Sequence, residues 1–355
     1  MKKTILITGG LGYIGSHAVI EFVKSGYEVV IIDNLSNTNI GVLDNIAKII
    51  NYKPKFYEIN LINKTGLKNI FSNHNFDGVI HFAGLKAVGE SCKNIGLYHN
   101  NNIVGTINLF ETMEKYGVRN IIFSSSATVY KVNSEINTGL KETNLTGDTS
   151  NPYGTTKFVI EQLLKDYKNH KSWKVINLRY FNPIGAHTSG LLGENPNGIP
   201  NNLLPYIMKV ATGELSEIGV FGNDYDTVDG TGVRDYIDVI DLVRGHLKAW
   251  ELVENQNTKG KMEKKKVESK NNGFFETFNL GVGKGVSVLE MINIANKVVG
   301  KDIPYTIKSR RSGDLAIVYS DSSKANKILG WKTKISTMES IENSWKFYKK
   351  LKIKD

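Results

Sequence analysis

The sequence predicts an α/β protein built on a doubly wound parallel sheet, with a smaller α/β lobe toward its C-terminal end. Three observations predict this fold class. Short apolar runs alternate with amphipathic stretches in the first half of the chain, a glycine-rich turn follows the first run, and Gly, Pro and Asn become frequent after about residue 182. Apolar strands separated by helices are typical of a parallel sheet that is covered on both faces. We therefore expect one unit at 1–182 and a smaller, interleaved lobe at 183–355, with a site between them.

The order of the elements follows from the apolar pattern. Six short apolar runs are predicted to be strands, at 4–8, 28–33, 54–60, 77–83, 119–125 and 173–179. The amphipathic stretches between them predict helices, among them 14–25, 41–51, 94–116 and 152–169. Three further helices are expected in the second half, at 200–213, 239–253 and 287–299. The chain has no internal repeat.

The composition excludes several classes of protein. Of the 355 residues, 40% are hydrophobic and 23% are charged, as is ordinary for a globular protein. No apolar stretch approaches the roughly 20 residues that span a bilayer, and Met-Lys-Lys leads directly into the first apolar run. We therefore expect no membrane segment, no signal peptide and a cytoplasmic location. The single cysteine, Cys92, excludes an internal disulfide framework and is expected to be a small buried side chain.

The net charge of +10 raises the question of nucleic-acid binding. Part of this charge lies in 255–272, a segment rich in lysine and asparagine that lacks an apolar period. Such a composition predicts a disordered surface insertion. No aromatic residue interleaves with its lysines, as a single-strand binder requires, so we do not expect a nucleic-acid partner.

The glycine-rich turn has the form of a dinucleotide site. Gly9, Gly12 and Gly15 lie between the first strand and the first helix. Glycine permits a sharp turn, close approach of backbone to phosphate and close packing of helix on strand, and the helix N-terminus favours a pyrophosphate. Asp33 closes the next strand, where a carboxylate accepts hydrogen bonds from ribose hydroxyls and repels a 2′-phosphate. Because no Lys or Arg follows at 34–38, the sequence favours NAD over NADP.

A second group of residues is suited to proton transfer. Tyr153 and Lys157 are four residues apart and lie on one face of the predicted helix. A phenol has a pKa of about 10, so a phenolate near pH 7 needs about 4 kcal/mol of preferential stabilisation. A neighbouring ammonium supplies part of this and an oxidised nicotinamide supplies more. Ser126 follows Ser124 and Ser125 at the end of a strand, where ligands bind in doubly wound sheets. The pattern predicts a nicotinamide-dependent enzyme that acts on an alcohol or a ketone.

Several longer segments resemble one enzyme family, namely 79–91, 123–130, 178–183, 199–203 and 229–236. Together with the glycine turn and the Tyr-Lys pair, they are similar to segments of the extended short-chain dehydrogenases/reductases, and within them of the UDP-glucose 4-epimerases. The resemblance covers nearly the whole chain outside 255–272. It implies a Rossmann domain at 1–182 that binds NAD and a lobe at 183–355 that binds a nucleotide-sugar.

The resemblance also assigns roles to single positions. It implies that Tyr153, Lys157 and Ser126 are catalytic. It implies cofactor contacts at Gly9, Gly12, Tyr13, Ile14, Gly15, Asp33, Asn34, Leu35, Ser36, Asn37, Thr38, Asn60, Leu61, Phe82, Ala83, Gly84, Leu85, Lys86, Asn101, Ser126, Tyr153, Lys157 and Phe181. Asn60 stands where the family usually has Asp and keeps an acceptor near the adenine without the charge.

For the nucleotide-sugar, the resemblance implies contacts at Lys86, Ser126, Tyr153, Tyr180, Asn182, Asn202, Leu203, Phe221, Arg234, Tyr236, Arg311, Asp314 and Val318. Arginines present planar forks to diphosphate oxygens, and an aromatic ring can cover a uracil face. Two positions depart from the family, since Lys131 stands where Gly is common and Asp238 where His is frequent; we expect altered packing only. Val318 is small where some members are bulky, which resembles members that also accept N-acetylated UDP-hexoses.

The implied reaction is epimerisation at C4 of a UDP-hexose, from UDP-galactose to UDP-glucose, through a transient 4-ketose and a resident NAD. A nucleotide-sugar 4,6-dehydratase is the alternative within the fold, but it usually has an Asp-Glu pair where this chain has Ala127-Thr128. A decarboxylase of UDP-glucuronate is disfavoured for the same reason. A non-catalytic dinucleotide-binding scaffold is the alternative from another class, and the intact catalytic residues argue against it.

No metal site is expected, because the seven histidines show no His-Glu-x-x-His or comparable spacing. His81 lies on a buried strand and is interpreted as a core residue with satisfied hydrogen bonds. The family commonly pairs through two long helices, so the stretches 94–116 and 152–169 predict a homodimer.

Overall fold

The protein is described by a computed structural model that covers residues 2–131, 139–263, 273–311 and 314–353. Its centre is a seven-stranded sheet with the order β11-β6-β5-β4-β1-β2-β3, in which every pairing is parallel. The strands are β1 (Thr4–Thr8), β2 (Glu28–Asp33), β3 (Lys55–Glu58), β4 (Gly78–His81), β5 (Asn120–Ser126), β6 (Lys174–Tyr180) and β11 (Phe274–Leu280). The predicted doubly wound parallel sheet is confirmed.

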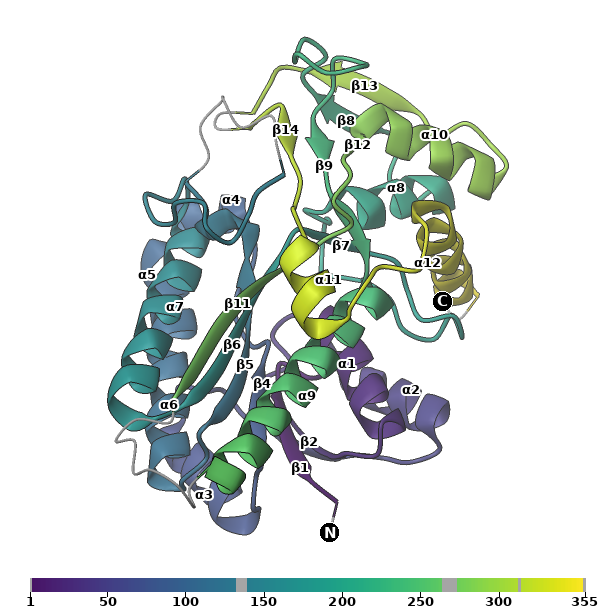
Figure 1. Cartoon of the computed structure of the whole chain (residues 1–355). Helices are drawn as coiled ribbons and strands as arrows, with labels where there is room; N and C mark the ends of the chain where they lie inside the picture. Colours follow the sequence, from purple (N-terminus) through teal and green to yellow (C-terminus); the bar gives the residue numbers. More distant parts are fainter. Residues whose placement is uncertain (1, 132–138, 264–272, 312–313, 354–355) are drawn as a thin grey trace.

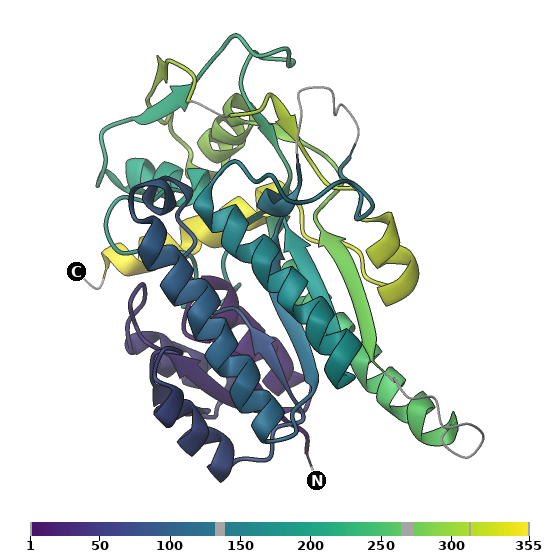
Figure 2. The same ribbon diagram turned by 90° about the vertical axis from the view of Figure 1, so that its left-hand side faces the viewer.

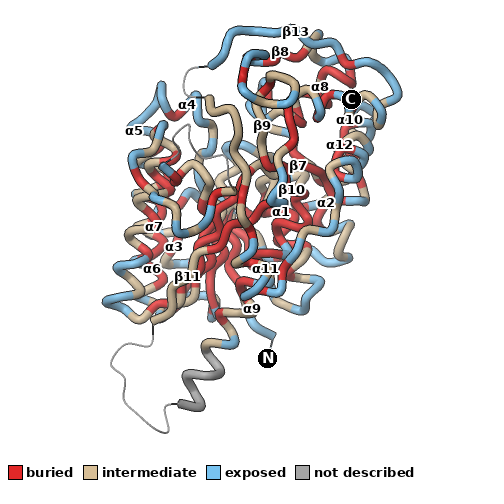
Figure 3. Tube along the Cα trace, turned by 45° about the horizontal axis from the view of Figure 1, so that its top comes forward, coloured by how far each residue is buried: buried red, intermediate tan, exposed pale blue. Residues whose placement is uncertain are grey.

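Helices cover both faces of this sheet (Figure 1). One face carries α1 (Tyr13–Lys24), α2 (Gly41–Ile50) and α9 (Val239–Glu263), and the other carries α3 (Lys64–Asn73), α6 (Gly105–Lys115) and α7 (Pro152–Lys171). Successive side chains of a strand point to opposite faces, so each strand feeds two apolar cores. In β1, Ile5 and Ile7 pack in the core on the α1 side, whereas Leu6 packs in the core on the α6 side. Figure 3 shows that the residues in the middle of the sheet are mostly buried.

The smaller lobe lies beyond the carboxyl ends of the strands (Figure 1). Its helices are α8 (Leu203–Thr212), α10 (Val288–Val299) and α12 (Thr337–Lys352), which share a third apolar core. Its short strands form the pairs β7 (Asn182–Ile184) with β10 (Tyr236–Asp238) and β8 (Ile218–Phe221) with β13 (Tyr305–Lys308). A three-stranded sheet joins β12 (Val286–Ser287), β9 (Val233–Arg234) and β14 (Ile317–Val318). The helix α11 (Ser323–Leu329) contacts α9 and β11.

The predicted helix at 94–116 is a succession of helical segments with different winding. It comprises α5 (Ile95–Tyr98), a π-helical segment η1 (His99–Val104) and α6, and it is preceded by α4 (Val88–Lys93). π-helical turns are rare and occur frequently at functional sites. Figure 2 shows this helical stretch and α7 running next to each other across one face of the molecule. Cys92 on α4 is exposed, so the expectation of a buried thiol was wrong.

The segment 239–280 packs with the sheet unit, although it lies within 183–355 of the chain. It returns to the sheet unit after the lobe has begun, because α9 packs against α1 and β11 pairs with β6. The helix α9 also continues to Glu263, so 255–263 is helical and not disordered as predicted. Extending an existing helix costs no new nucleation, and Gln, Lys and Glu have good helix propensity. The remainder of the predicted insertion, 264–272, lies outside the described residues. None of the described helices is long and apolar enough to cross a membrane.

Candidate active site

The glycine turn is shaped so that side chains are excluded from it. Gly9 has φ +67°, and a Cβ atom there would lie 2.8 Å from the backbone nitrogen of Ala83. A Cβ atom at Gly15 would lie 2.1 Å from the carbonyl oxygen of Gly9. Helix α1 begins at Tyr13, and Gly12 at its N-cap provides no side chain to cap the first turn. The turn therefore forms a cradle of backbone at a helix N-terminus, which fits the pyrophosphate of a dinucleotide.

Asp33 connects the end of β2 to this turn. Its carboxylate accepts hydrogen bonds from the backbone N–H of Leu11 (3.0 Å) and of Leu35 (2.9 Å). Burial raises the pKa of Asp33, and these backbone donors oppose the rise. Thr38 donates a hydrogen bond from its hydroxyl to the carbonyl of Leu11 (2.8 Å). The predicted cofactor segment 33–38 is thus attached to the glycine turn by direct hydrogen bonds.

The predicted adenine contacts lie next to this segment. The backbone N–H of Ile59 donates to the carbonyl of Asp33 (2.9 Å), which brings the end of β3 beside the end of β2. Asn60 accepts a hydrogen bond from the backbone N–H of Ile62 (2.9 Å), and Leu61 is buried in the core on the α6 side. The amide oxygen of Asn60 is therefore already hydrogen-bonded to the backbone two residues later.

The predicted cofactor loop at 82–86 is held by a residue that sequence reasoning missed. Asn102 accepts a hydrogen bond from the N–H of Leu85 (2.8 Å) and donates one to its carbonyl (3.0 Å). Its amide also donates to the hydroxyl of Thr156 on α7 (3.1 Å). The predicted contact residue Asn101 precedes it in η1 and donates to its side-chain oxygen (3.0 Å). Only its place in an asparagine-rich run beside Asn101 could have pointed to Asn102.

His81 is a core residue, as predicted. Its Nδ1 is 2.7 Å from the hydroxyl of Thr8, and its Nε2 is 2.8 Å from the hydroxyl of Thr106. Burial, and secondarily the charge of Lys157, lower the pKa of His81 to about 3. The imidazole is therefore neutral and hydrogen-bonded on both sides.

The three predicted catalytic residues are brought together where β5 meets α7. Ser126 ends β5, and Tyr153 and Lys157 lie one turn apart near the start of α7. Asn151 caps this helix by accepting from the N–H of Gly154 (2.9 Å). Burial raises the pKa of Tyr153 to about 12, and its hydrogen bond with Ser126 opposes this rise. The end of β5 and the start of α7 thus bring the three side chains to one place.

Lys157 is fixed in place by the strand beneath it. Its Nζ donates to the carbonyl of Ser124 (2.7 Å) and lies 5.8 Å from the centre of the Tyr153 ring. Burial lowers the pKa of Lys157 to about 8, and the negative charge of Glu161 opposes the decrease. With that pKa, the side chain is predominantly an ammonium at pH 7.

A buried ion pair that sequence reasoning missed lies behind this lysine. Arg179 donates to both carboxylate oxygens of Glu161, from Nε (2.9 Å) and from Nη2 (2.6 Å). Ser125 adds a third hydrogen bond to the same carboxylate (2.6 Å). The carboxylate of Glu161 thus joins α7 to β5 and β6, and its partner Ser125 precedes Ser126 in β5. Nothing in the sequence indicates that these two residues meet.

Four of the residues predicted to bind the nucleotide-sugar come together in the lobe. The guanidinium of Arg311 lies 4.8 Å from the ring centre of Phe221, and its Nε donates to Asp314 (2.9 Å). Arg234 forms a longer ion pair with the same carboxylate (3.9 Å). Burial raises the pKa of Tyr236 to about 12, and the charges of Arg234 and Arg311 oppose the rise. Two arginines, a partly exposed aromatic ring and a carboxylate therefore face one region.

Asp235 places Arg234 and Tyr236, its neighbours in the chain. Its carboxylate accepts from the backbone N–H groups of Val282 (2.8 Å), Gly283 (3.1 Å) and Ser320 (3.0 Å), and from the hydroxyl of Ser320 (2.6 Å). Four donors satisfy this buried carboxylate. Sequence reasoning quoted Asp235 within a motif but assigned it no role.

The remaining predicted substrate residues differ in how they are placed. Asn182 lies opposite Tyr236 in the pairing of β7 with β10. Val318 packs against a small apolar cluster that contains the predicted cofactor residue Phe181. Tyr180 is buried, and its hydroxyl is hydrogen-bonded to His246 in the core, so in this structure the hydroxyl is already engaged.

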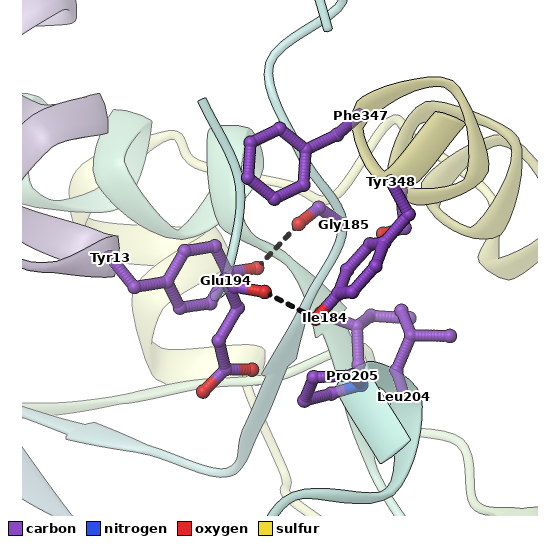
Figure 4. A pocket seen from close by; sticks show the side chains of 9 residues that line it. Tyr13, Ile184, Gly185, Glu194, Leu204, Pro205, Phe347 and Tyr348 are labelled. Carbon is purple, nitrogen blue, oxygen red and sulfur yellow. Dashed lines mark hydrogen bonds between the residues drawn. The ribbon is translucent and has the colours of Figure 1, made fainter. Parts of the chain in front are cut away.

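Lys86, Asn202 and Leu203 lie between the two units. Asn202 is the N-cap of α8 and Leu203 is its first residue. Lys86 and Asn202 both contact the side chain of Glu194, which also lines a small cavity between α1 and α12 (Figure 4). Glu194 is a further residue that the sequence analysis missed.

Comparison with known proteins agrees with this geometry. Residues 6–344 match the family model described as GDP-mannose 4,6 dehydratase. The chain is 47% identical over 349 residues to UDP-glucose 4-epimerase of Bacillus subtilis, a match that covers 97% of this chain and 96% of the relative. A crystal structure of UDP-glucose 4-epimerase from Bifidobacterium longum in complex with NAD+ and UDP is 44% identical, with a TM-score of 0.88 and coverage of 98% of both chains. The enzyme from Stenotrophomonas maltophila, with bound NAD and formylated UDP-arabinopyranose, has a TM-score of 0.91 at 40% identity and covers 99% of this chain and 100% of its own.

The match to a dehydratase model is a relationship of the wider family, and the residues after Ser126 distinguish the two reactions. Ala127 and Thr128 form a short 3-10 turn, and Thr128 donates its hydroxyl to Ser126 (3.0 Å). The Asp-Glu pair expected of a dehydratase is replaced here by an apolar residue and a hydroxyl. The chain belongs to the UDP-glucose 4-epimerases of the extended short-chain dehydrogenase/reductase family.

Proposed function

We propose that this chain interconverts UDP-galactose and UDP-glucose by epimerisation at C4, with NAD as a resident cofactor. The observation that carries the proposal is the grouping of Ser126, Tyr153 and Lys157 between the glycine turn and the arginine cluster of the lobe. The cradle at Gly9 and Gly15, which a Cβ atom would fill, fits NAD. The residues of the NAD side would be those of the glycine turn, 33–38 and 82–86, with Lys157 near the nicotinamide ribose.

The chain's own residues handle the proton and hold the sugar. When bound, NAD supplies the chemistry of hydride removal and return at C4. Tyr153, as phenolate, removes the proton of the 4-hydroxyl and returns it to the same oxygen after the 4-ketose has turned over. Ser126 donates a hydrogen bond to the reacting oxygen, and the ammonium of Lys157 stabilises the phenolate by its charge. Return of hydride to the opposite face inverts C4.

The charged and aromatic residues of the lobe are expected to contact the UDP moiety and not the hexose, which suits a reaction in which the hexose must rotate. Arg234 and Arg311 can bind diphosphate oxygens, and Phe221 can cover the uracil. Binding energy is thus concentrated at the UDP end, away from C4. Such remote binding allows a weakly held hexose to present either face without loss of the substrate.

One assay tests this function against its alternatives. The purified chain is incubated with UDP-galactose and no added cofactor, and the products are separated by chromatography. UDP-glucose supports the epimerase, a UDP-4-keto-6-deoxyhexose supports a 4,6-dehydratase, and absence of turnover supports a non-catalytic scaffold. Release of NAD from the denatured protein tests the resident cofactor in the same sample.

We propose in addition that UDP-GalNAc and UDP-GlcNAc are interconverted. Val318 pairs with Arg234 in the β14–β9 ladder, beside the cluster that contains Phe181. A small residue there leaves room for an N-acetyl group. Turnover of the acetylated pair by the wild type, and its selective loss in Val318→Tyr, is the expected result. Complete inertness of the wild type toward the acetylated pair contradicts it.

A cytoplasmic homodimer is the proposed state of the protein. The single cysteine fits a reducing compartment. Four large apolar side chains are exposed along α4, α5 and η1, at Val88, Ile95, Leu97 and Val104. Contiguous exposed apolar side chains mark interaction surfaces. A partner copy that packs its own α5–η1–α6 stretch and α7 against this face would cover them.

A further inference from the structure

We propose that Glu194 is a positioning residue that couples the cofactor loop to the substrate lobe. The proposal rests on the proposed function, because it concerns how the two halves of that active site are held together. Its carboxylate holds Lys86, which ends the cofactor loop, and Asn202, which begins the first helix of the lobe.

The two contacts converge on a single atom. Lys86 donates from Nζ to Oε1 of Glu194 (2.7 Å), and Asn202 donates from its amide nitrogen to the same oxygen (2.7 Å). The two donors must therefore stay within two hydrogen-bond lengths of each other. The side chain of Glu194 is 8% exposed and that of Lys86 is 46% exposed. A buried carboxylate is poorly solvated and depends on a charged partner. The ammonium of Lys86 is that partner for Glu194, so the pair should hold Lys86 in place.

The backbone around Glu194 places this carboxylate firmly. Tyr348 on α12 donates its hydroxyl to the carbonyl of Glu194 (2.8 Å). The preceding hairpin is closed by the bridge between Ala186 and Gly193. At its base, Tyr13 of the glycine turn donates to the carbonyl of Gly185 (2.8 Å), as Figure 4 shows. The hairpin that carries Glu194 is thus attached to the first residue of α1 and to the C-terminal helix.

The two residues held by Glu194 belong to different binding tasks. Lys86 follows Leu85, whose backbone is held by Asn102, so a change at Lys86 reaches the loop that faces the cofactor. Asn202 precedes Leu203 and occupies the N-cap position of the first helix of the substrate lobe. Without the carboxylate, the loop at 82–86 and helix α8 lose the acceptor to which both are hydrogen-bonded. Cofactor retention and substrate binding should then weaken together, although Glu194 itself contacts neither ligand in this scheme.

The test compares Glu194→Gln with a matched substitution elsewhere. Gln keeps the size of the side chain and an acceptor for Asn202 but removes the charge that holds Lys86. Glu276→Gln removes the charge from another partly buried Lys–Glu pair, with Lys324 (2.6 Å), outside the site. For each variant, retained NAD is measured after dialysis, kcat and KM are measured with UDP-galactose, and folding is checked by thermal unfolding.

Glu194→Gln is expected to raise KM at least about tenfold and to lose NAD on dialysis, whereas Glu276→Gln keeps both at the wild-type level. In a double-mutant cycle, Glu194→Gln should have little further effect in a Lys86→Met background, because the ion pair that it breaks is already absent there. Additive effects, or Glu194→Gln values equal to those of Glu276→Gln in an active enzyme, overturn the inference. An inactive wild type overturns the proposed function instead.

A second variant keeps the test decisive if Glu194→Gln unfolds. Asn202 is exposed, so Asn202→Ala removes its amide without opening the core. A role in substrate binding alone predicts a higher KM with NAD retained. Coupling through Glu194 predicts that NAD is also lost on dialysis, and full retention of NAD contradicts the coupling.

Discussion

Burial acts on Tyr153 and Lys157 in the same sense, because in both it disfavours the charged form. It raises the pKa of the phenol to about 12 and lowers that of the ammonium to about 8. At pH 7 the lysine is therefore charged and the tyrosine is neutral before ligands bind. In the proposed reaction, the phenolate would be stabilised by the positive charge of the oxidised cofactor, in addition to that of Lys157. Proton transfer is thereby confined to the loaded site.

Replacement of Tyr153 tests this assignment. Tyr153→Phe removes the hydroxyl but keeps the ring, so bound NAD should be retained while turnover of UDP-galactose falls by about 10²-fold or more. Tyr305→Phe, on the exposed strand β13, is the matched control and should leave both unchanged. Near-normal turnover by Tyr153→Phe would remove this residue from the mechanism.

Asp238 is not among the predicted catalytic residues, but the pKa of its carboxyl group is strongly raised. It accepts from the N–H of Ile240 (2.7 Å) and from the hydroxyl of Ser340 (2.7 Å), and burial raises its pKa to about 6. The ordinary value is 3.8, so between these values the folded protein binds a proton that the unfolded chain has lost. The contribution of Asp238 to the free energy of unfolding therefore decreases as pH rises through this window, by up to about 3 kcal/mol.

Asp238→Asn should remove that pH dependence. The amide can still accept from Ile240, and Ser340 can accept from the amide, so the packing is preserved. The stability of the variant relative to the wild type should increase as pH rises from 4 to 7, by about 2–3 kcal/mol. Urea unfolding at several pH values measures this difference. A constant difference across the range contradicts the raised pKa.

Among the elements, the π-helical segment η1 positions two asparagine side chains. It places Asn101 beside Asn102, and it aims Asn102 at the backbone of Leu85 and at α7 at the same time. An amide with both a donor and an acceptor can satisfy the two backbone groups of one loop residue. The loop at 82–86, the π-helical segment and α7 are thus joined at one side chain.

Asn102→Ala should loosen this junction. Loss of the buried hydrogen bonds leaves the polar groups of Leu85 without their partner, which is expected to cost about 2 kcal/mol of stability. The NAD content after dialysis should fall, because the loop at 82–86 is no longer tied to η1. Asn100→Ala, at an exposed position two residues earlier, serves as the control. Equal NAD content in the two variants contradicts this role.

The sequence predicted the elements that have a clear apolar pattern of their own. It missed elements that form only because a segment distant in the chain packs against them. The strands β1 and β2 are nearly continuous apolar runs, whereas β11 reads Phe-Phe-Glu-Thr-Phe-Asn-Leu and was not predicted. It forms a strand because the edge of β6 provides backbone hydrogen-bonding groups with which it pairs. The helix α12 has a capping box of Ser336 and Glu339 that sequence inspection could have used. The end of α9 lies beyond 253 because helix propagation is favourable without an apolar face.

For the whole molecule, the proposed dimer places the exposed apolar side chains of α5 and η1 at its interface. Leu97 is 49% exposed and Val104 is 42% exposed, and they are seven residues apart on one helical stretch. Both lie on the stretch α5–η1, which packs beside α7.

Val104→Glu should therefore convert a dimer into a monomer, because a charge would be buried in an apolar interface. Light scattering after size exclusion measures the mass of the wild type and of the variant. Ile328→Glu, at an exposed apolar position on α11, is the control and should not change the mass. A wild type that is monomeric at micromolar concentration, or a Val104→Glu variant that stays dimeric, contradicts the proposed interface.

The sequence by itself determined the parallel sheet, the glycine cradle and the pairing of Tyr153 with Lys157. Each of these depends on residues close together in the chain, through strand period, turn geometry or helical spacing. The tertiary structure alone decided that Glu194 meets Lys86, that Asn102 meets Leu85 and that Glu161 meets Arg179. Their partners are remote in the chain, and the charge or amide of each is meaningful only once the fold has buried it beside its partner. The placing of the Tyr180 hydroxyl against His246 likewise depends on which core the folded chain forms around it.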